Sequence, residues 1–254
     1  MINAVGVVIP AHDEQDLLPS CLAAVRLAAR QVSVPVHVVV VADACTDQTA
    51  ELASAQGTIV VAARARSVGA ARRAGVRQVL RSVRHLDPAA LWIATTDADT
   101  LVPRCWLSRQ LRYASLGWKG VVGTVTVGDW SGHPPQVRRR YTRHYRAWQE
   151  LHPHVHGANL GFAADAYLAV GGFRPLPTAE DHALVEDLRT AGVPLLRTTR
   201  IPVVTSARAR ARAPRGFSWL LGTLAGADAP SPGRGPGLSE LDQGLSQRRA
   251  GTPG

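Results

Sequence analysis

The chain has 254 residues, a hydrophobic fraction of 46% and a formal net charge of +10, which fits one large or two small globular domains. Its three isolated cysteines exclude a disulfide framework and a Cys-x-x-Cys zinc site, and no apolar run approaches the roughly 20 residues that span a bilayer. The charge favours an anionic partner: a nucleic acid, a membrane surface or a phosphate-bearing small molecule. Because Lys119 is the only lysine, a compositional bias toward arginine is an alternative explanation for the excess.

Short apolar runs alternate with amphipathic segments up to about residue 102. The runs predict strands at 5–9, 34–43, 58–63 and 90–97, and the segments between them predict helices at 14–29, 46–56 and 67–83. Asp13 lies where the first of these helices needs an N-cap. Strands that are apolar throughout are buried on both faces, so this alternation predicts an α/β fold with a doubly wound, mostly parallel sheet flanked by helices.

The pattern changes after residue 102. Strands are expected at 120–130 and 194–199, and helices at 107–116, 164–170 and 180–191. The segment 131–140 is expected to be a loop that leads into a helix reaching residue 151, and 152–162 is expected to be irregular. The last part of the chain is rich in Gly, Pro and Ser, which predicts a disordered tail over 225–254.

Two carboxylates follow the fourth predicted strand. Ligands of a doubly wound sheet bind beyond the carboxyl ends of its strands, and Asp97 and Asp99 lie at such an end. An extended backbone sends residues i and i+2 to the same side, where two carboxylates repel unless a hard cation such as Mg²⁺ or Mn²⁺ lies with them. The alternative is a turn in which one aspartate caps the helix that begins near Pro103.

The ends of the second and third predicted strands carry further candidates. Asp43 follows the second strand, and a helix N-terminus at this place can receive part of a nucleotide. Arg72 and Arg73 follow the third strand and offer planar forks for phosphate oxygens. The alternatives are capping of the second helix by Asp47 and a solvated helix face that carries both arginines.

Six segments match a known pattern in sequence and spacing. They read VVIPAHDEQDLLPSCLAAV, VVVVADACTDQTAELA, SVGAARRAGV, TTDADT, HGANLGFAADAYLAVGGF and AEDHALVEDLRTAGV. Together they resemble the family 2 glycosyltransferases of the GT-A fold, over roughly residues 4–205. The resemblance implies one GT-A domain over 1–224, with a nucleotide-binding half of about 1–102 and an acceptor half of about 103–224. The chain departs from the family at 42–45, which reads Ala-Asp-Ala-Cys instead of Asp-Asp-Gly-Ser.

The resemblance also implies a role for each candidate residue. Asp43 would bind the nucleotide base, and Arg72 would lie near the base or the diphosphate. Asp99 would ligate the divalent cation directly, and Asp97 would contact the ribose or the metal. Asp181 would be the general base that deprotonates an acceptor hydroxyl in an inverting transfer, with Glu180 assisting its orientation, although both acids also suit the first turn of a helix. The residues implied to line the nucleotide pocket are Pro10, Ala11 and Asp13, and those at the acceptor site are Gly157, Ala158 and Asn159.

These expectations describe an inverting, non-processive hexosyltransferase that uses Mg²⁺ or Mn²⁺ and a UDP-, GDP- or dTDP-sugar. The acceptor would be a small molecule or lipid-linked. A sugar nucleotidyltransferase is disfavoured because IPAHDEQD lacks a Gly-rich basic loop, and a nucleic-acid-binding protein is disfavoured because the arginines are scattered. A degenerate, non-catalytic domain is disfavoured because Asp97, Asp99 and Asp181 are all present.

Two groups of basic residues have several interpretations. Arg208, Arg210, Arg212 and Arg215 could form a flexible loop over the diphosphate, an amphipathic segment at a membrane surface, or a solvated stretch. His152, His154 and His156 have no cysteine beside them, which disfavours zinc, while His156 and His182 are candidates to complete the shell of a catalytic metal. The N-terminus lacks the basic stretch of a signal peptide, so we expect a cytoplasmic protein with at most peripheral contact at the inner face of the membrane.

Overall fold

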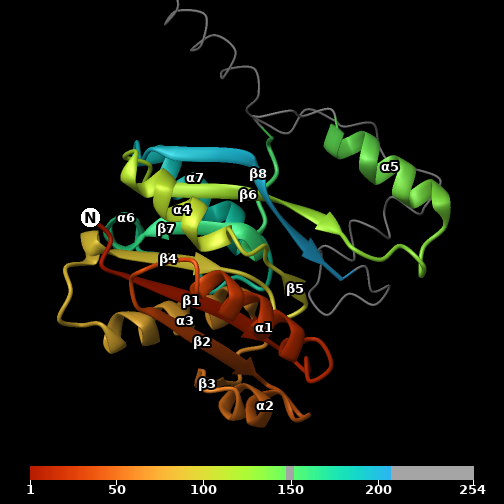
Figure 1. The fold of residues 1–254 in the computed structure, drawn as a ribbon, viewed down its shortest axis with the longest axis horizontal. Coiled ribbons are helices and arrows are strands. Elements are labelled where there is room, and N and C mark those ends of the chain that lie inside the picture. Colours follow the sequence, from red (N-terminus) through yellow and green to blue (C-terminus); the bar gives the residue numbers. More distant parts are fainter. Residues whose placement is uncertain (147–151, 207–254) are drawn as a thin grey trace, which may run out of the picture.

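The fold is built on an eight-stranded sheet (Figure 1). The computed structural model of the protein describes residues 1–146 and 152–206. The strands are β1 (Ala4–Ala11), β2 (Val36–Asp43), β3 (Ile59–Ala63), β4 (Leu91–Thr95), β5 (Thr100–Leu101), β6 (Gly120–Val127), β7 (Leu160–Ala163) and β8 (Leu195–Thr205). Within the sheet they lie in the order β3-β2-β1-β4-β7-β6-β8-β5.

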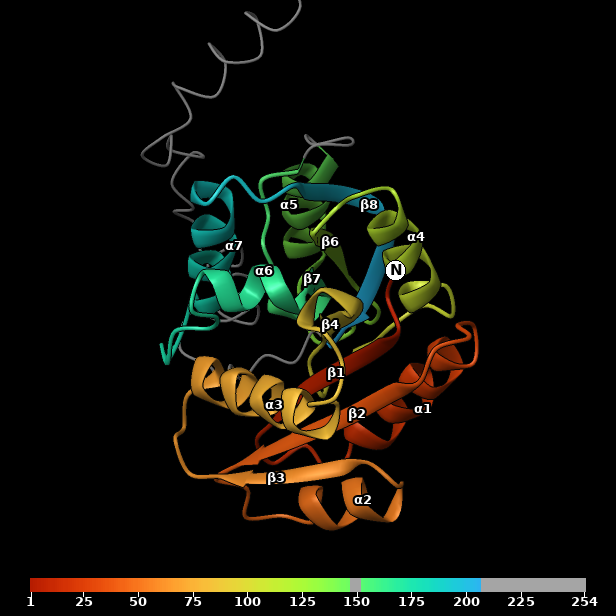
Figure 2. The same cartoon turned by 90° about the vertical axis from the view of Figure 1, so that its left-hand side faces the viewer.

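Helices cover both faces of this sheet. They are α1 (Leu18–Ala29), α2 (Thr49–Ala55), α3 (Val68–Ser82), α4 (Trp106–Ser115), α5 (Pro135–Arg146), α6 (Ala164–Ala169) and α7 (Glu180–Thr190), with short 3₁₀ turns η1 (Pro88–Ala90) and η2 (Gly157–Asn159). Figure 2 shows α1 and α4 on one side of the sheet and α3, α6 and α7 on the other.

The strand directions bring most carboxyl ends to one edge. Strands β1, β2, β3 and β4 are mutually parallel, and β6 is parallel to β8. Strand β7 is antiparallel to both β4 and β6, so β6 and β8 point the same way as β1–β4. The predicted α/β class with a mostly parallel sheet is therefore confirmed, and the loops after these strands are the place for a ligand.

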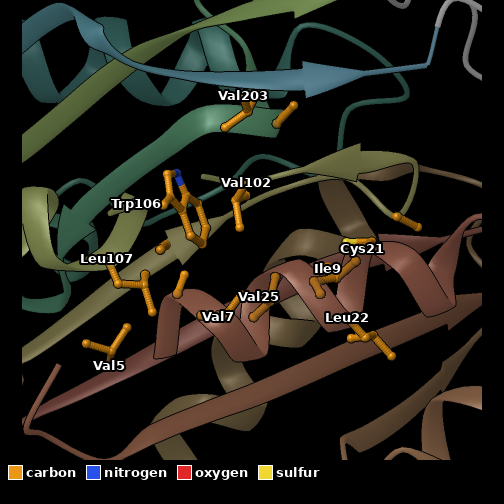
Figure 3. Packing of buried hydrophobic residues seen from close by; sticks show 14 of the residues in the cluster. Val5, Val7, Ile9, Cys21, Leu22, Val25, Val102, Trp106, Leu107 and Val203 are labelled. Carbon is orange, nitrogen blue, oxygen red and sulfur yellow. The ribbon is translucent and has the colours of Figure 1, made fainter. Parts of the chain in front are cut away.

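Side chains of β1 alternate between two cores because successive residues of a strand face opposite ways. Val5, Val7 and Ile9 pack against α1 and α4, as Figure 3 shows. Val8 belongs to the cluster under α3, α6 and α7. All four side chains are fully buried. Burial on both faces explains why this strand is apolar throughout.

The structure corrects several sequence-based boundaries. Strand β7 begins at Leu160, inside the segment expected to be irregular, and α5 begins at Pro135, inside the expected loop. Helix α1 begins at Leu18, and Asp13 is not its cap but has a left-handed backbone with φ 52°. The short strand β5 was not expected, and β8 extends to Thr205, beyond the predicted 194–199.

Some expectations fall outside the described residues. They include the basic segment 208–215, the tail 225–254, the end of the expected helix at residue 151 and the domain boundary at 224. Among the helices that the structure does describe, none combines the length and the apolar character needed to cross a bilayer.

Candidate functional site

The loops that follow β1 and β2 are tied together by aspartates. The Asp13 carboxylate accepts hydrogen bonds from the backbone N–H of Thr46 at 2.6 Å and of Asp47 at 3.3 Å. In return, Asp47 accepts one from the backbone N–H of Gln15 at 3.0 Å. The bond from Thr46 is the main cause of a lowered pKa of Asp13. Asp13 therefore holds the loop after β1 against the loop after β2. Pro10 and Ala11 are the last two residues of β1 at this edge of the sheet.

Asp43 holds the loop between β3 and α3. It is 5% exposed, and its carboxylate accepts hydrogen bonds from the backbone N–H groups of Ala65 at 2.7 Å, Arg66 at 3.1 Å and Ser67 at 3.0 Å. Ser67 is the N-cap of α3. Asp43 thus positions the start of α3, the helix that carries Arg72. Its implied role in binding the nucleotide base stays a prediction.

Backbone strain gathers around the same edge. Outside glycine, positive φ values within the described residues occur at Asp13, Ala44, Arg66 and Ala179. The first three follow β1, β2 and β3, and the fourth is the N-cap of α7. A left-handed backbone costs about 1–2 kcal/mol for a residue with a Cβ, and such strain is found preferentially at functional sites.

Arg72 is buried and joins two carboxylates. Its side chain is 4% exposed, one of its terminal nitrogens donates to Glu180, and the other donates to Asp97. Glu180 is 2% exposed overall, whereas the Asp97 side chain is 38% exposed. A guanidinium fork suits two carboxylates at once. Arg72 thereby links α3 to the start of α7 and to the end of β4, and contact with a diphosphate stays a prediction.

The backbone of Gly157 lies directly against the guanidinium group of Arg72. A Cβ at residue 157 would lie 2.3 Å from Cζ of Arg72, so only glycine fits here without movement. The backbone N–H of Gly157 donates to Asp181 Oδ2 at 2.7 Å, and its carbonyl accepts from the Thr95 hydroxyl at 2.6 Å. Gly157 thus fixes Asp181 relative to the end of β4.

Asp97 and Asp99 lie partly exposed in the turn between β4 and β5. Burial raises the pKa of Asp97, Arg72 opposes this shift, and the negative charges of Asp99 and Asp181 raise it further. Asp99 accepts from the hydroxyls of Thr100 at 3.3 Å and Thr205 at 3.4 Å. Neighbouring carboxylates that disfavour one another's charge form an oxygen donor set that fits a hard divalent cation.

A different group of three side chains brings potential metal-ligating atoms close together. Ligand atoms of Asp13, Cys45 and Asp47 lie within 4.8 Å of one another. The two carboxylates already accept the hydrogen bonds that join their loops, and Asp47 also accepts one from the Thr49 hydroxyl. Those hydrogen bonds account for the short distances between the two carboxylates, so no metal ion is needed to explain them.

Asn159 is buried in the core at 1% exposure. Its amide nitrogen donates to the carbonyls of Thr124 at 2.8 Å and Ile201 at 2.7 Å, and its oxygen accepts from Trp106 Nε1 at 3.0 Å. These bonds join β6, β8 and α4 behind the site. Ala158 beside it is also buried, at 6% exposure, and acceptor contact by either residue stays a prediction.

The histidines before η2 form a stacked row. The ring centroids of His152 and His154 are 6.2 Å apart, and those of His154 and His156 are 6.1 Å apart. Burial lowers the pKa of His156 to about 4, with the charge of Asp181 acting in the opposite direction. The sequence HPHVH shows that the three histidines alternate with other residues. It does not show that their rings stack or that His156 lies near Asp181.

The chain is similar in sequence to known proteins. The sequence pattern described as Glycosyl transferase family 2 matches residues 6–170. An undecaprenyl-phosphate 4-deoxy-4-formamido-L-arabinose transferase of Pectobacterium carotovorum is 31% identical over 131 residues, which are 49% of this chain and 37% of that protein. The transferase of the same name from Serratia proteamaculans is 32% identical over 131 residues, with the same coverage. The match thus spans little more than a third of the length of these relatives.

Solved structures share the fold at low sequence identity. The mannosyltransferase PcManGT from Pyrobaculum calidifontis, in complex with GDP-Man and Mn²⁺, has a TM-score of 0.58 and 19% identity over 96% of this chain and 80% of its own. TarS 1-349 from S. aureus, in complex with UDP-GlcNAc, has a TM-score of 0.60 and 12% identity over 89% of this chain and 65% of its own. These likenesses confirm the predicted GT-A fold.

Proposed function

Since the chain belongs to glycosyl transferase family 2, we propose that it transfers a sugar from a nucleotide-diphosphate sugar to an acceptor oxygen. The observation that supports this most strongly is the convergence of Asp97, Asp99 and Asp181 at the carboxyl edge of the sheet. The Gly157 N–H holds Asp181 through a 2.7 Å hydrogen bond, and the negative charges of Asp99 and Asp181 both act on Asp97.

Asp181 is the proposed general base. Its Oδ2 is oriented by the Gly157 N–H, while Oδ1 accepts from the N–H of His182 at 2.8 Å. When the acceptor is a hydroxyl, Asp181 takes its proton as the oxygen attacks the anomeric carbon and the nucleoside diphosphate leaves on the opposite face. A single in-line displacement of this kind inverts the anomeric configuration and needs no sugar bound covalently to the protein.

Asp99 and Asp97 are the proposed ligands of Mg²⁺ or Mn²⁺. The metal, when bound, supplies positive charge that stabilises the departing diphosphate. Asp97 keeps one oxygen on Arg72, and Asp99 is oriented by the Thr100 and Thr205 hydroxyls. The Pyrobaculum mannosyltransferase was solved in complex with Mn²⁺ as well as GDP-Man, which supports a divalent ion.

The acceptor is proposed to be lipid-linked, with a small molecule as the alternative. The matched Pectobacterium and Serratia proteins are named undecaprenyl-phosphate transferases. In such an acceptor the attacking atom is a phosphate oxygen, which is already deprotonated. The transfer would then need no general base, and Asp181 would keep only its hydrogen bonds from the Gly157 and His182 N–H groups. A protein that meets its acceptor at the inner face of the cytoplasmic membrane needs only peripheral contact with the lipid surface.

Donor binding tests this function. Binding of UDP-, GDP- and dTDP-sugars is measured with Mn²⁺, with Mg²⁺ and with neither, on the full chain and on Asp99→Ala. We expect metal-dependent binding of at least one donor, weakened more than about tenfold by Asp99→Ala, since changes to groups that merely support a metal ligand already cost about 10–100-fold. Asp165→Ala is the control because Asp165 follows β7 at the opposite edge of the sheet. Binding that ignores both the metal and Asp99 would refute the assignment.

A second variant separates chemistry from binding. Asp181→Asn removes the proposed base but keeps an oxygen that can accept from the Gly157 N–H. For a hydroxyl acceptor we expect donor affinity close to that of the unmodified chain and a transfer rate lower by about 10²–10⁴-fold. Equal losses of donor binding and transfer would mean that Asp181 is structural.

A further inference from the structure

A pocket opens between the end of β6 and the start of α5. Its volume is about 530 Å³, which lies within the usual range for small-molecule sites. The residues that line it include Val127, Asp129, Trp130, Ser131, His133 and Arg138. The motifs that resemble the family do not include any of these residues.

This pocket adjoins the proposed metal site through β8. Val127 is the register partner of Thr205, and the Gly128 N–H donates to the Thr205 carbonyl at 3.4 Å. The Thr205 hydroxyl in turn donates to Asp99 at 3.4 Å. Figure 1 shows the same neighbourhood, with α5 following the carboxyl end of β6 and β5 beside β8. A molecule in the pocket would therefore approach the site from the acceptor half of the chain.

The wall of the pocket is anchored to the core. The Trp130 ring lies 5.2 Å from the ring of Tyr141 and 6.1 Å from that of His133, measured between centroids. Tyr141 is buried, and its hydroxyl donates to the Val125 carbonyl at 2.7 Å. The residue one turn earlier in α5, Val137, is 1% exposed. Helix α5 thus holds the aromatic wall in place through its buried residues Val137 and Tyr141.

The charge around the pocket is strongly positive. Residues 127–146 contain one acidic residue, Asp129, and five arginines. The Asp129 carboxylate is occupied with the Ser131 N–H at 2.8 Å and the Ser131 hydroxyl at 2.9 Å. Arg138 lines the pocket in the second turn of α5, close to the positive end of the helix dipole, and both it and Arg139 are exposed. This combination selects an anion rather than a neutral sugar.

We propose that this pocket binds a phosphate monoester carried by the acceptor, with Arg138 as its main ligand and Trp130 as its apolar wall. The proposal rests on the proposed sugar transfer, because it assigns a chemical class to the second substrate of that reaction. A phosphate dianion matches the guanidinium fork of Arg138, which binds anions through its N–H donors, and it is attracted by the positive end of the α5 dipole. The phosphate belongs either to a membrane lipid or to a soluble metabolite, and binding probes tell the two apart.

The test compares two neighbouring arginines of equal charge. Arg138→Gln alters the pocket, whereas the matched control Arg139→Gln removes the same charge from a neighbouring exposed position that does not line it. Co-sedimentation is measured with phosphatidylcholine vesicles that contain polyprenyl phosphate, with vesicles that contain phosphatidylglycerol instead, and with phosphatidylcholine alone. Glycerol 3-phosphate is titrated separately as the soluble phosphate monoester, and nucleotide-sugar binding is recorded for every variant.

We expect selective binding of one phosphate monoester, weakened about tenfold or more in Arg138→Gln, since a charge-assisted hydrogen bond of this kind contributes at least one order of magnitude. Arg139→Gln should stay within about twofold, as for an exposed charge, and Arg138→Lys should recover part of the loss. Selective binding of the vesicles identifies a lipid source, and binding of glycerol 3-phosphate identifies a soluble one.

Three results would overturn the proposal: equal losses in both glutamine variants, equal binding of phosphatidylglycerol and polyprenyl phosphate vesicles, or no binding of either phosphate monoester. Donor binding separates this failure from failure of the proposed function. If donors bind in a metal-dependent way while phosphate monoesters do not, only the acceptor assignment is wrong. If no donor binds, the proposed function itself fails.

Discussion

Replacing Arg72 by alanine should strongly destabilise the fold rather than only weaken donor binding. Arg72 is 3% exposed, and its guanidinium is shared between Glu180, which is 2% exposed, and Asp97. Its removal leaves the Glu180 carboxylate buried without a counter-charge, which costs about 3–5 kcal/mol. The Asp97 side chain is 38% exposed, so solvent screening limits its share of the loss to about 0–1 kcal/mol.

A loss of this size is a large fraction of the 5–15 kcal/mol by which domains are typically stable. Urea denaturation followed by circular dichroism measures it directly. Arg73→Ala is the matched control, because Arg73 is the exposed neighbour on the same helix and its loss should cost less than about 0.5 kcal/mol. The double variant Arg72→Met with Glu180→Leu should recover most of the stability, because no buried charge then remains unpaired.

The reasoning would be refuted if Arg72→Ala and Arg73→Ala had the same free energy of unfolding within about 1 kcal/mol, the usual size of a single-mutant effect. A chain with Arg72→Ala that stayed fully stable and lost only donor affinity would point instead to direct contact between the guanidinium and the diphosphate. That outcome would restore the role implied by the family resemblance.

Three further predictions concern stability and geometry. Gly157→Ala places a Cβ 2.3 Å from Cζ of Arg72 and should destabilise the fold by about 1–3 kcal/mol and lower transfer more than donor affinity. Ala44→Gly relieves a left-handed φ of 54° and should raise the free energy of unfolding by up to about 1 kcal/mol, because the relieved strain of about 1–2 kcal/mol exceeds the extra entropy that glycine loses on folding. Because the pKa of His156 falls from 6.5 to about 4 on folding, the unfolded chain binds more protons between these values, so stability should fall as the pH drops from 6.5 toward 4, and less steeply in His156→Gln.

The first two of these have simple controls in denaturant titrations. Gly132 has open space around it, so Gly132→Ala should be nearly neutral, and a similar result for Gly157→Ala would contradict the packing argument. Ala53 lies buried within α2, so Ala53→Gly should destabilise where Ala44→Gly stabilises. An unchanged slope in His156→Gln would show that burial of His156 does not govern the pH dependence of stability.

The first half of the fold could be predicted from local pattern alone. Runs such as Val38–Val41 are apolar throughout because β2 is a central strand with a helix layer on each face. The family resemblance is confirmed as well, since it depends on the order of several short motifs. In both cases the information lies within a few neighbouring residues.

The second half could not be predicted as well, because its pairings are distant in sequence. Strand β7 has four residues, one of them glycine, and it exists because β4 and β6 flank it on both sides. Its own periodicity is too short to separate a strand from a loop. The start of α5 was hidden by Pro134 and Pro135, although proline is well suited to the first turn of a helix.

For the candidate site, the sequence identified residue types but not their partners. It pointed to Arg72 and Glu180 separately, yet a bond between residues 108 positions apart leaves no local signal. The same limit applies to Asp43, whose three backbone donors lie in the next strand-to-helix loop. The pocket beside Trp130 was missed for a further reason, since it forms only when α5 packs through Tyr141 onto β6.

The central claim, sugar transfer from a nucleotide-diphosphate sugar, is tested most directly by the release of nucleoside diphosphate. The full chain is incubated with each of the UDP-, GDP- and dTDP-sugars, with Mn²⁺ or Mg²⁺ and with membranes or small-molecule extracts as the source of acceptor. The account predicts release from at least one donor that requires the metal and is lost in Asp99→Ala but kept in Asp165→Ala. Absence of release from every donor, or release that is unchanged in Asp99→Ala, would contradict it.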